Sequence, residues 1–339
     1  MKTFCFFCCF VWLFATYNTL LAQERPLYSQ YFQNQFIENP SYAGNDAYGS
    51  AFLTYRQQWA GVENAPQTTA FTLNIPYYEN RGGFGLNIYH DVVNVMARTK
   101  AMATGAVHIF GNYDKSSKLS MGMSAGLLSN RIDPSRVRVA HAQDPQILSS
   151  VQNFTSFELA AGFNLMIRYK FQLGLAFPQL LGTNFHFMAL EPDTKRRNFH
   201  QLQHFLINAR YKWENKYRTL SLEPLLMVRM AEQSPIQLDG GLMATFNNIF
   251  WLSGCYRTDY AVSTAAGFAS RHLRFGYSYD FHTGPLAGNM GGSHELTLGY
   301  TFGNLPDNPL SKAKNKSWQK KRRKWHPSRP HPIFFKKKR

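Results

Sequence analysis

The residues of this chain that are best suited to chemistry are histidines, serines and carboxylates, but their spacing supports no reaction centre. His200 and His204 stand four residues apart in "NFHQLQHF", which places both on one face of a predicted strand. No carboxylate or third ligand accompanies them at metal spacing, which favours isolated polar histidines over a metal site. Serines, histidines and carboxylates all occur, yet no signature joins a nucleophile, a base and an orienting acid. We expect no catalysis, no metal and no cofactor.

Glycine and cysteine motifs give no reaction centre either. "GGFG" (82–85) and "GNMGG" (288–292) lack the strand-to-helix context of a phosphate loop and are interpreted as turn glycines. Cys255 is interpreted as inert packing.

A different kind of site is suggested by single charged residues that interrupt apolar segments. We interpret them either as a polar network that rigidifies the interior of the fold, or as a docking surface for the N-terminal segment or another protein. These candidates are Arg56, Glu223, Arg229, Asp239, Arg257, Arg274, Asp280 and Glu295.

The elements that position these charges are strands. In "LRFGYSYDF" the apolar Leu273, Phe275 and Tyr277 alternate with Arg274 and Gly276, and the same period of two recurs in "HELTLGYTF" and "FQLGLAF". We predict fourteen strands, at 48–59, 66–76, 82–93, 98–111, 117–131, 155–167, 169–179, 198–213, 217–230, 236–246, 249–257, 260–269, 271–282 and 294–302.

Strand length, aromatic placement and loop length distinguish a membrane barrel from a soluble sandwich. The predicted strands are mostly about nine residues or longer, enough to cross a bilayer at a tilt. Aromatic pairs near strand ends, such as Phe250 with Trp251 and Tyr300 with Phe302, are typical of interface girdles. The long connections 132–154, 180–197 and 283–293 all follow odd-numbered strands, whereas short turns follow even ones. This asymmetry favours an antiparallel outer-membrane β-barrel of about 14 strands, with long loops outside and both chain termini in the periplasm.

The N-terminus predicts export. Residues 1–22 combine Lys2, an apolar centre from Phe4 to Ala15 and a small residue, Ala22, which is typical of a signal peptide. Its removal takes Cys5, Cys8 and Cys9 with it, so no disulfide is expected in the mature chain. We predict a periplasmic or lumen-docked segment at 23–47, a barrel at 48–302 and a basic tail at 303–339.

Several motifs carry a family resemblance. The segment "YSQYFQNQFIENPSYAG" (28–44) and "YRQQWAG" (55–61) resemble the signatures of the PorP/SprF outer-membrane proteins, with Ser41 in place of the usual alanine. Further blocks, including "LEPLLMVR" and "RFGYSYDF", follow in family order over about residues 27 to 302. The matching motif positions are Tyr28, Ser29, Gln30, Tyr31, Asn39, Pro40, Tyr42, Ala43, Gly44, Arg56 and Trp59.

The resemblance implies a non-enzymatic barrel of the type IX secretion system, in the outer membrane of a Gram-negative bacterium. Its implied partners are secretion components, a secreted cargo such as a gliding adhesin, and outer-membrane lipid. We expect no nucleic acid and no small-molecule substrate. A passive porin for small hydrophilic solutes is the alternative function, and a lumenal lipid hydrolase is a third.

The basic tail departs from the family pattern. Residues 304–339 carry 13 Lys and Arg against Asp307, a net charge of 13 − 1 = +12 out of +17 for the chain. An anionic inner surface of the membrane, the cell wall or an acidic face of the secretion ring would suit this charge as a partner. The other interpretation is a solvated tail with no specific partner. Its densest run is Lys320, Lys321, Arg322, Arg323 and Lys324.

Overall fold

The computed structural model describes residues 25–46, 48–77, 81–111, 116–133, 152–181, 184–186, 198–200, 203–231, 234–283 and 291–303. The predicted signal peptide and basic tail, and most of the three long connections, lie outside these residues. Among the described residues, no helix is both long and apolar enough to cross a membrane.

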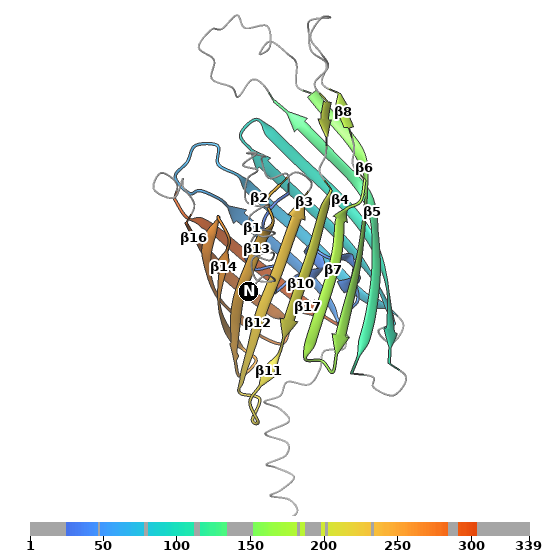
Figure 1. Cartoon of the computed structure of the whole chain (residues 1–339), viewed down its shortest axis with the longest axis vertical. Coiled ribbons are helices and arrows are strands. Elements are labelled where there is room, and N and C mark those ends of the chain that lie inside the picture. Colours follow the sequence, from blue (N-terminus) through green and yellow to red (C-terminus); the bar gives the residue numbers. More distant parts are fainter. Residues whose placement is uncertain are drawn as a thin grey trace, which may run out of the picture. The chain divides into compact units, whose positions relative to one another are not determined.

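In the described part of the chain, fourteen antiparallel strands form a closed ring (Figure 1). Each strand pairs with its neighbour in sequence, and β1 pairs with β17 to close the ring. Closure pairs the backbone groups of every strand, as a membrane-spanning sheet requires. The ring consists of β1 (Gly49–Gln57), β2 (Gln67–Tyr77), β3 (Gly82–Val93), β4 (Met96–Phe110), β5 (Lys118–Ile132), β6 (Gln152–Ile167), β7 (Phe171–Gln179), β10 (His204–Tyr211), β12 (Leu220–Ala231), β13 (Gln237–Phe246), β14 (Phe250–Arg257), β15 (Ala261–Ala269), β16 (Leu273–His282) and β17 (Ser293–Phe302).

The predicted eighth strand, 198–213, is the one that the structure divides. Residues 198–200 form β9 (Asn198–His200), which pairs only with β8 (Asn184–His186) in a small separate sheet. The ring strand β10 begins at His204, and β11 (Trp213–Glu214) adds a short pairing with β12. His200 and His204 therefore belong to different strands, and the prediction that they share one strand face was wrong.

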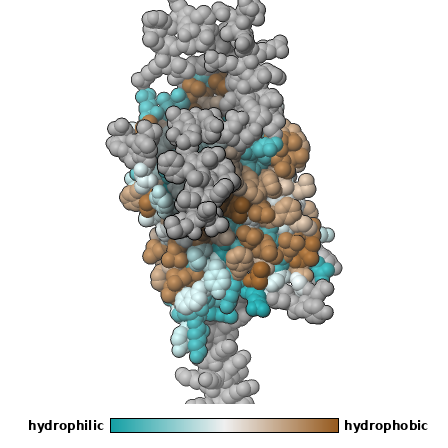
Figure 2. Space-filling model, viewed as in Figure 1, coloured by the Kyte–Doolittle hydropathy of each residue, from teal (hydrophilic) through white to brown (hydrophobic). Residues whose placement is uncertain are grey.

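The period of two sorts side chains as predicted. In β17, Leu298 is 47% exposed on the outer face, whereas Glu295 on the other face is 1% exposed. Apolar side chains gather in the same way over the outer surface of other strands (Figure 2). One aromatic assignment was wrong: Trp251 points inward and packs edge-on against Phe32, with ring centroids 5.5 Å apart, whereas its neighbour Phe250 faces outward.

The connections differ between the two ends of the ring. The longest ones follow β5, β7 and β16, as predicted, and they share one end with the turn after β12 and the turn after β14. The rule is not strict, because β3 and β4 are joined at this end by Asn94 and Val95 alone. We call this the outer end, since longer loops of bacterial barrels face outward.

Candidate functional site: a segment docked on the inner wall

Residues 25–46, called here the lumen segment, lie inside the ring. Two short 3-10 helices, η1 (Gln35–Ile37) and η2 (Pro40–Tyr42), form its middle part. Most of its side chains are buried, and its residues bond to inward-facing groups from β1 and β2 around to β10, β14 and β17. Only a segment inside the ring reaches strands on all sides of it.

The lumen segment runs from the outer end toward the opposite end. Its start, Arg25 to Leu27, lines a cavity together with Ser234 and Pro235 from the turn after β12. Its last residues lie at the other end, where the Lys118 Nζ atom, at the start of β5, donates to the carbonyl oxygen of Asn45 at 2.6 Å.

The first motif of the segment, residues 28–30, is bound by an ion cluster of Arg56, Asp280 and Glu295. The Arg56 guanidinium donates to Asp280 Oδ2 at 2.6 Å and to Glu295 Oε2 at 3.1 Å, and all three side chains are fully buried. Arg56 and Glu295 face each other directly across the β1–β17 pair that closes the ring. A pair of opposite charges at directly opposed positions on one face stabilises an antiparallel pair of strands.

The same cluster binds the backbone of Ser29 and Gln30. The amide of Ser29 donates to Glu295 Oε2 at 2.8 Å, and the amide of Gln30 donates to Glu295 Oε1 at 2.9 Å. The Ser29 hydroxyl donates to Asp280 at 2.8 Å and accepts from Arg56 Nη1 at 3.0 Å. One carboxylate thus captures two consecutive amides, and charge-assisted bonds of this kind are among the stronger ones in proteins.

A second cluster continues the network beside the first. Asp239 and Arg257 are direct cross-strand partners on β13 and β14, and Arg257 Nε donates to Asp239 Oδ1 at 2.9 Å. Arg229 also pairs with Asp239. Arg257 Nη2 donates to the carbonyl oxygen of Tyr28 at 3.1 Å, while the Arg229 guanidinium lies 5.5 Å from the centre of the Tyr31 ring.

The two clusters together balance their charges. Arg56, Arg229 and Arg257 give +3, and Asp239, Asp280 and Glu295 give −3. Buried ions need such pairing, because removing a charge from water is costly. These carboxylates accept hydrogen bonds from guanidinium and amide groups, and the amides belong to the lumen segment. The clusters therefore fix residues 28–30 against the wall.

The second motif, residues 39–44, docks on another part of the wall. Asn39 Nδ2 donates to the carbonyl oxygens of Phe163 and Leu175 at 3.2 and 3.1 Å, and its Oδ1 accepts from the amide of Ser41 at 2.9 Å. His108 Nε2 bonds the carbonyl oxygen of Ala43 at 3.0 Å.

Close packing at Gly44 explains the glycine of this motif. Gly44 has a φ of +65° and lies against Gly83 of β3, so a Cβ atom on either residue would overlap the backbone of the other. Glycine is the residue that tolerates both the left-handed conformation and the close approach.

The remaining predicted residues lie in different places. Glu223 is buried and faces Arg210 of β10 at 3.5 Å. Arg274 Nη2 donates at 2.6 Å to the hydroxyl of Tyr48, and burial raises the pKa of that phenol. Trp59 lies outside the strands in the connection after β1, where its amide donates to Ser293 Oγ at 3.3 Å.

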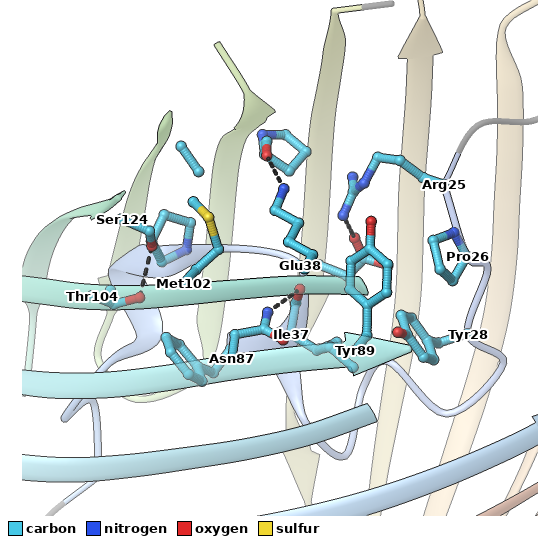
Figure 3. Close-up of a pocket in the computed structure, with 15 residues that line it drawn as sticks. Arg25, Pro26, Tyr28, Ile37, Glu38, Asn87, Tyr89, Met102, Thr104 and Ser124 are labelled. Carbon is cyan, nitrogen blue, oxygen red and sulfur yellow. Dashed lines mark hydrogen bonds and ion pairs between the residues drawn. The ribbon is translucent and has the colours of Figure 1, made fainter. Parts of the chain in front are cut away.

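Sequence reasoning missed several wall residues that contact or face the lumen segment. Lys100 pairs with Glu158 across β5, at 3.3 Å. Figure 3 shows the wall beside η1, where Asn87 donates to the carbonyl oxygen of Ile37 and Arg25 pairs with Glu38 at 3.0 Å. Lys100 and Glu158 gave the same signal as Arg56, namely a single charge at an inward position of an apolar strand.

Comparison with known proteins decides the family. The model of the family "Type IX secretion system membrane protein PorP/SprF" matches residues 20–300. The chain belongs to the PorP/SprF family. It is a β-barrel of the Gram-negative outer membrane, associated with type IX secretion. None of the curated proteins compared with this PorP/SprF chain matches it.

Solved structures similar to this PorP/SprF protein are other outer-membrane barrels. A mutant of the TodX monoaromatic hydrocarbon channel is 8% identical with a TM-score of 0.48, over 79% of this chain and 94% of that one. A FadL homologue of Pseudomonas aeruginosa is 10% identical with a TM-score of 0.44, over 78% and 92%. Omp33 of Acinetobacter baumannii is 7% identical with a TM-score of 0.43, over 76% and 100%.

Proposed function

We propose that this PorP/SprF protein is a closed scaffold, which binds an exported cargo protein at its outer end and secretion components at its periplasmic end. The observation that carries the proposal is the capture of the Ser29 and Gln30 amides by Glu295, inside the buried ion clusters. A segment held by buried charges is costly to displace, because displacement leaves those charges without their partners.

The outer connections are the proposed cargo-contacting surface. Most of this surface, the predicted loops 132–154, 180–197 and 283–293, lies outside the described residues. The strands that flank these loops all have that end at the outer end of the ring. The basic tail, also outside the described residues, is the proposed contact with an acidic partner or lipid.

Crosslinking in intact envelopes tests cargo binding directly. A photoreactive residue in the 132–154 loop is expected to capture a secreted protein, whereas the same residue at the β13–β14 turn, on the opposite end, is expected to capture none. Removal of residues 304–339 is expected to reduce recovery of periplasmic secretion components and to leave cargo capture unchanged. Equal capture of cargo at the two ends would contradict the proposed division.

Planar-bilayer recording tests the alternative of a passive porin. The full mature chain is expected to show almost no steady conductance, because residues 25–46 occupy the lumen. A chain without residues 25–44 that still runs as a folded barrel on unheated gels is expected to conduct. Steady conductance of the full chain, together with no captured cargo, would favour the porin.

A further inference from the structure

Strand length changes abruptly in the ring between β6 and β7. β5 and β6 have 15 and 16 residues, whereas β7 has 9. β6 pairs with β5 from Gln152 to Met166, but with β7 only from Ala161 to Ile167. Figure 1 shows β5 and β6 continuing past β7 toward the outer end. Among the described residues, the outer part of β6 is therefore paired on one side only.

The direction of the backbone groups decides what this side of β6 presents. In an antiparallel ladder, alternate residues direct both backbone groups toward the same neighbouring strand. The carbonyl oxygen of Leu159 accepts from the amide of Leu180, just after β7, at 2.9 Å, so the odd-numbered residues of β6 face the β7 side. Farther out, the amides and carbonyls of Asn153, Thr155 and Phe157 point to that side, and no described strand pairs with them there. We call these three residues the β6 edge.

The outward side chains mark where the apolar surface ends along this edge. Phe157 is 53% exposed, and its partner on β5, Leu127, is 55% exposed. The next outward residues are polar, namely Ser129 on β5, with Thr155 and Asn153 on β6. In a membrane barrel the lipid-facing band is apolar, so it ends at this level. The β6 edge thus begins at the membrane boundary and continues into water.

An extended polypeptide is the ligand that a free strand edge recognises, because its amides and carbonyls continue the ladder. Lipid is disfavoured, since Asn153 and Thr155 lie beyond the apolar band. The edge is also continuous with the proposed cargo-contacting surface, because β6 and β7 carry the predicted connections 132–154 and 180–197. These two observations favour a strand of an exported protein as the occupant.

We propose that the β6 edge binds an extended segment of the exported cargo as an added β-strand. The inference rests on the proposed function, because it assigns the contact by which the outer end holds cargo. Main-chain hydrogen bonds supply the affinity in this mode of recognition.

Amide hydrogen exchange in the full mature chain in detergent tests whether the edge is free. The amides of Thr155 and Phe157 are expected to exchange at least about tenfold faster than that of Ser156, which faces Leu128 on β5. Equal protection of all three amides without added partner would mean that another part of the chain, or a second copy, covers the edge. That result would overturn the proposal.

A strand peptide tests binding to the edge. The probe is an eight-residue peptide of alternating threonine and valine, and the control is the same peptide methylated on every amide nitrogen, which leaves it no backbone donors. The unmodified peptide is expected to bind at least about tenfold more tightly and to slow exchange at Thr155. Equal binding of the two peptides would contradict recognition through the main chain.

The variant Thr155→Pro tests the position of the added strand. It removes one amide from the β6 edge and leaves the β5–β6 ladder intact, because the amide of residue 155 points away from β5. We expect about tenfold weaker binding of the unmodified peptide. The matched control is Thr155→Val, which keeps both the amide and the size of the side chain and is expected to bind like the natural chain. Unheated gels report whether each variant is folded, and equal binding by the two folded variants would refute the site.

The same variants separate this inference from the proposed function. Cargo capture in envelopes that is insensitive to Thr155→Pro leaves the scaffold function standing and refutes the β6 edge as the cargo contact. Peptide binding that is lost in Thr155→Pro, without any cargo captured in envelopes, supports a strand-binding edge and refutes the proposed function.

Discussion

Two regions of the inner wall hold the same lumen segment by different chemistry. On β1, β14, β16 and β17, buried ions bind residues 28–30 through Arg56, Arg257, Asp280 and Glu295. On β3, β5 and β6, glycines let the backbone of residues 39–44 approach the wall closely. Charges fix orientation but are costly to leave unpaired, whereas close packing depends on the absence of a single methyl group. The first motif is therefore sensitive to charge, and the second is sensitive to volume.

The largest effect is expected from breaking the charged region at Arg56. In Arg56→Gln, Asp280 and Glu295 lose their guanidinium partner while fully buried, which is expected to cost about 3–5 kcal/mol. Urea unfolding of the barrel in detergent, followed by tryptophan fluorescence, measures this loss.

The control for Arg56→Gln is Arg274→Gln. Arg274 is only half-buried and donates to the Tyr48 hydroxyl, so its loss is expected to cost less than the loss of the fully buried Arg56. A similar loss of stability in both variants would show that the ion cluster has no special role.

A smaller effect, confined to the second motif, is expected from Gly83→Val. The new side chain would overlap Gly44, and overpacking of this kind costs about 1–3 kcal/mol. Because the ring itself need not change, we expect faster hydrogen exchange at residues 40–45 and unchanged exchange at Ser29 and Gln30.

Gly105→Val on the neighbouring strand is the matched control, because a Cβ at Gly105 meets no atom within 4 Å. Its exchange rates at residues 40–45 are expected to equal those of the natural chain. Faster exchange at both motifs in Gly83→Val would mean that the two regions release the segment together.

The smallest effect is expected at an ion pair near the barrel rim. Arg131 and Asp133 lie 3.9 Å apart, and the Arg131 side chain is 55% exposed. Arg131→Ala is expected to change the urea midpoint by less than the equivalent of about 1 kcal/mol, since water and salt screen such pairs. A loss approaching that of Arg56→Gln would contradict the importance given to burial.

The sequence predicted strands well where one strand runs the whole height of the ring. The predicted 82–93 has the bounds of β3, and most other strands differ by only a few residues. The failure at 198–213 has a physical reason. Alternation with period two is the same in a ring strand and in the small β8–β9 sheet, so it does not reveal where pairing changes partner. Trp251 was misassigned because an aromatic residue near a strand end can belong to an interface girdle or face the lumen. Only the structure shows that the Trp251 side chain points inward.

The sequence by itself determined which side chains face inward, because alternation along a strand is a local property of the backbone. The unequal lengths of its connections also indicated an outer-membrane β-barrel, and the order of its motifs indicated the family. Only the tertiary structure decided that Ser29 meets Glu295, two residues 266 positions apart. That contact depends on ring closure between β1 and β17 and on the path of the lumen segment. Both are set by pairing over the whole chain, which no local pattern contains.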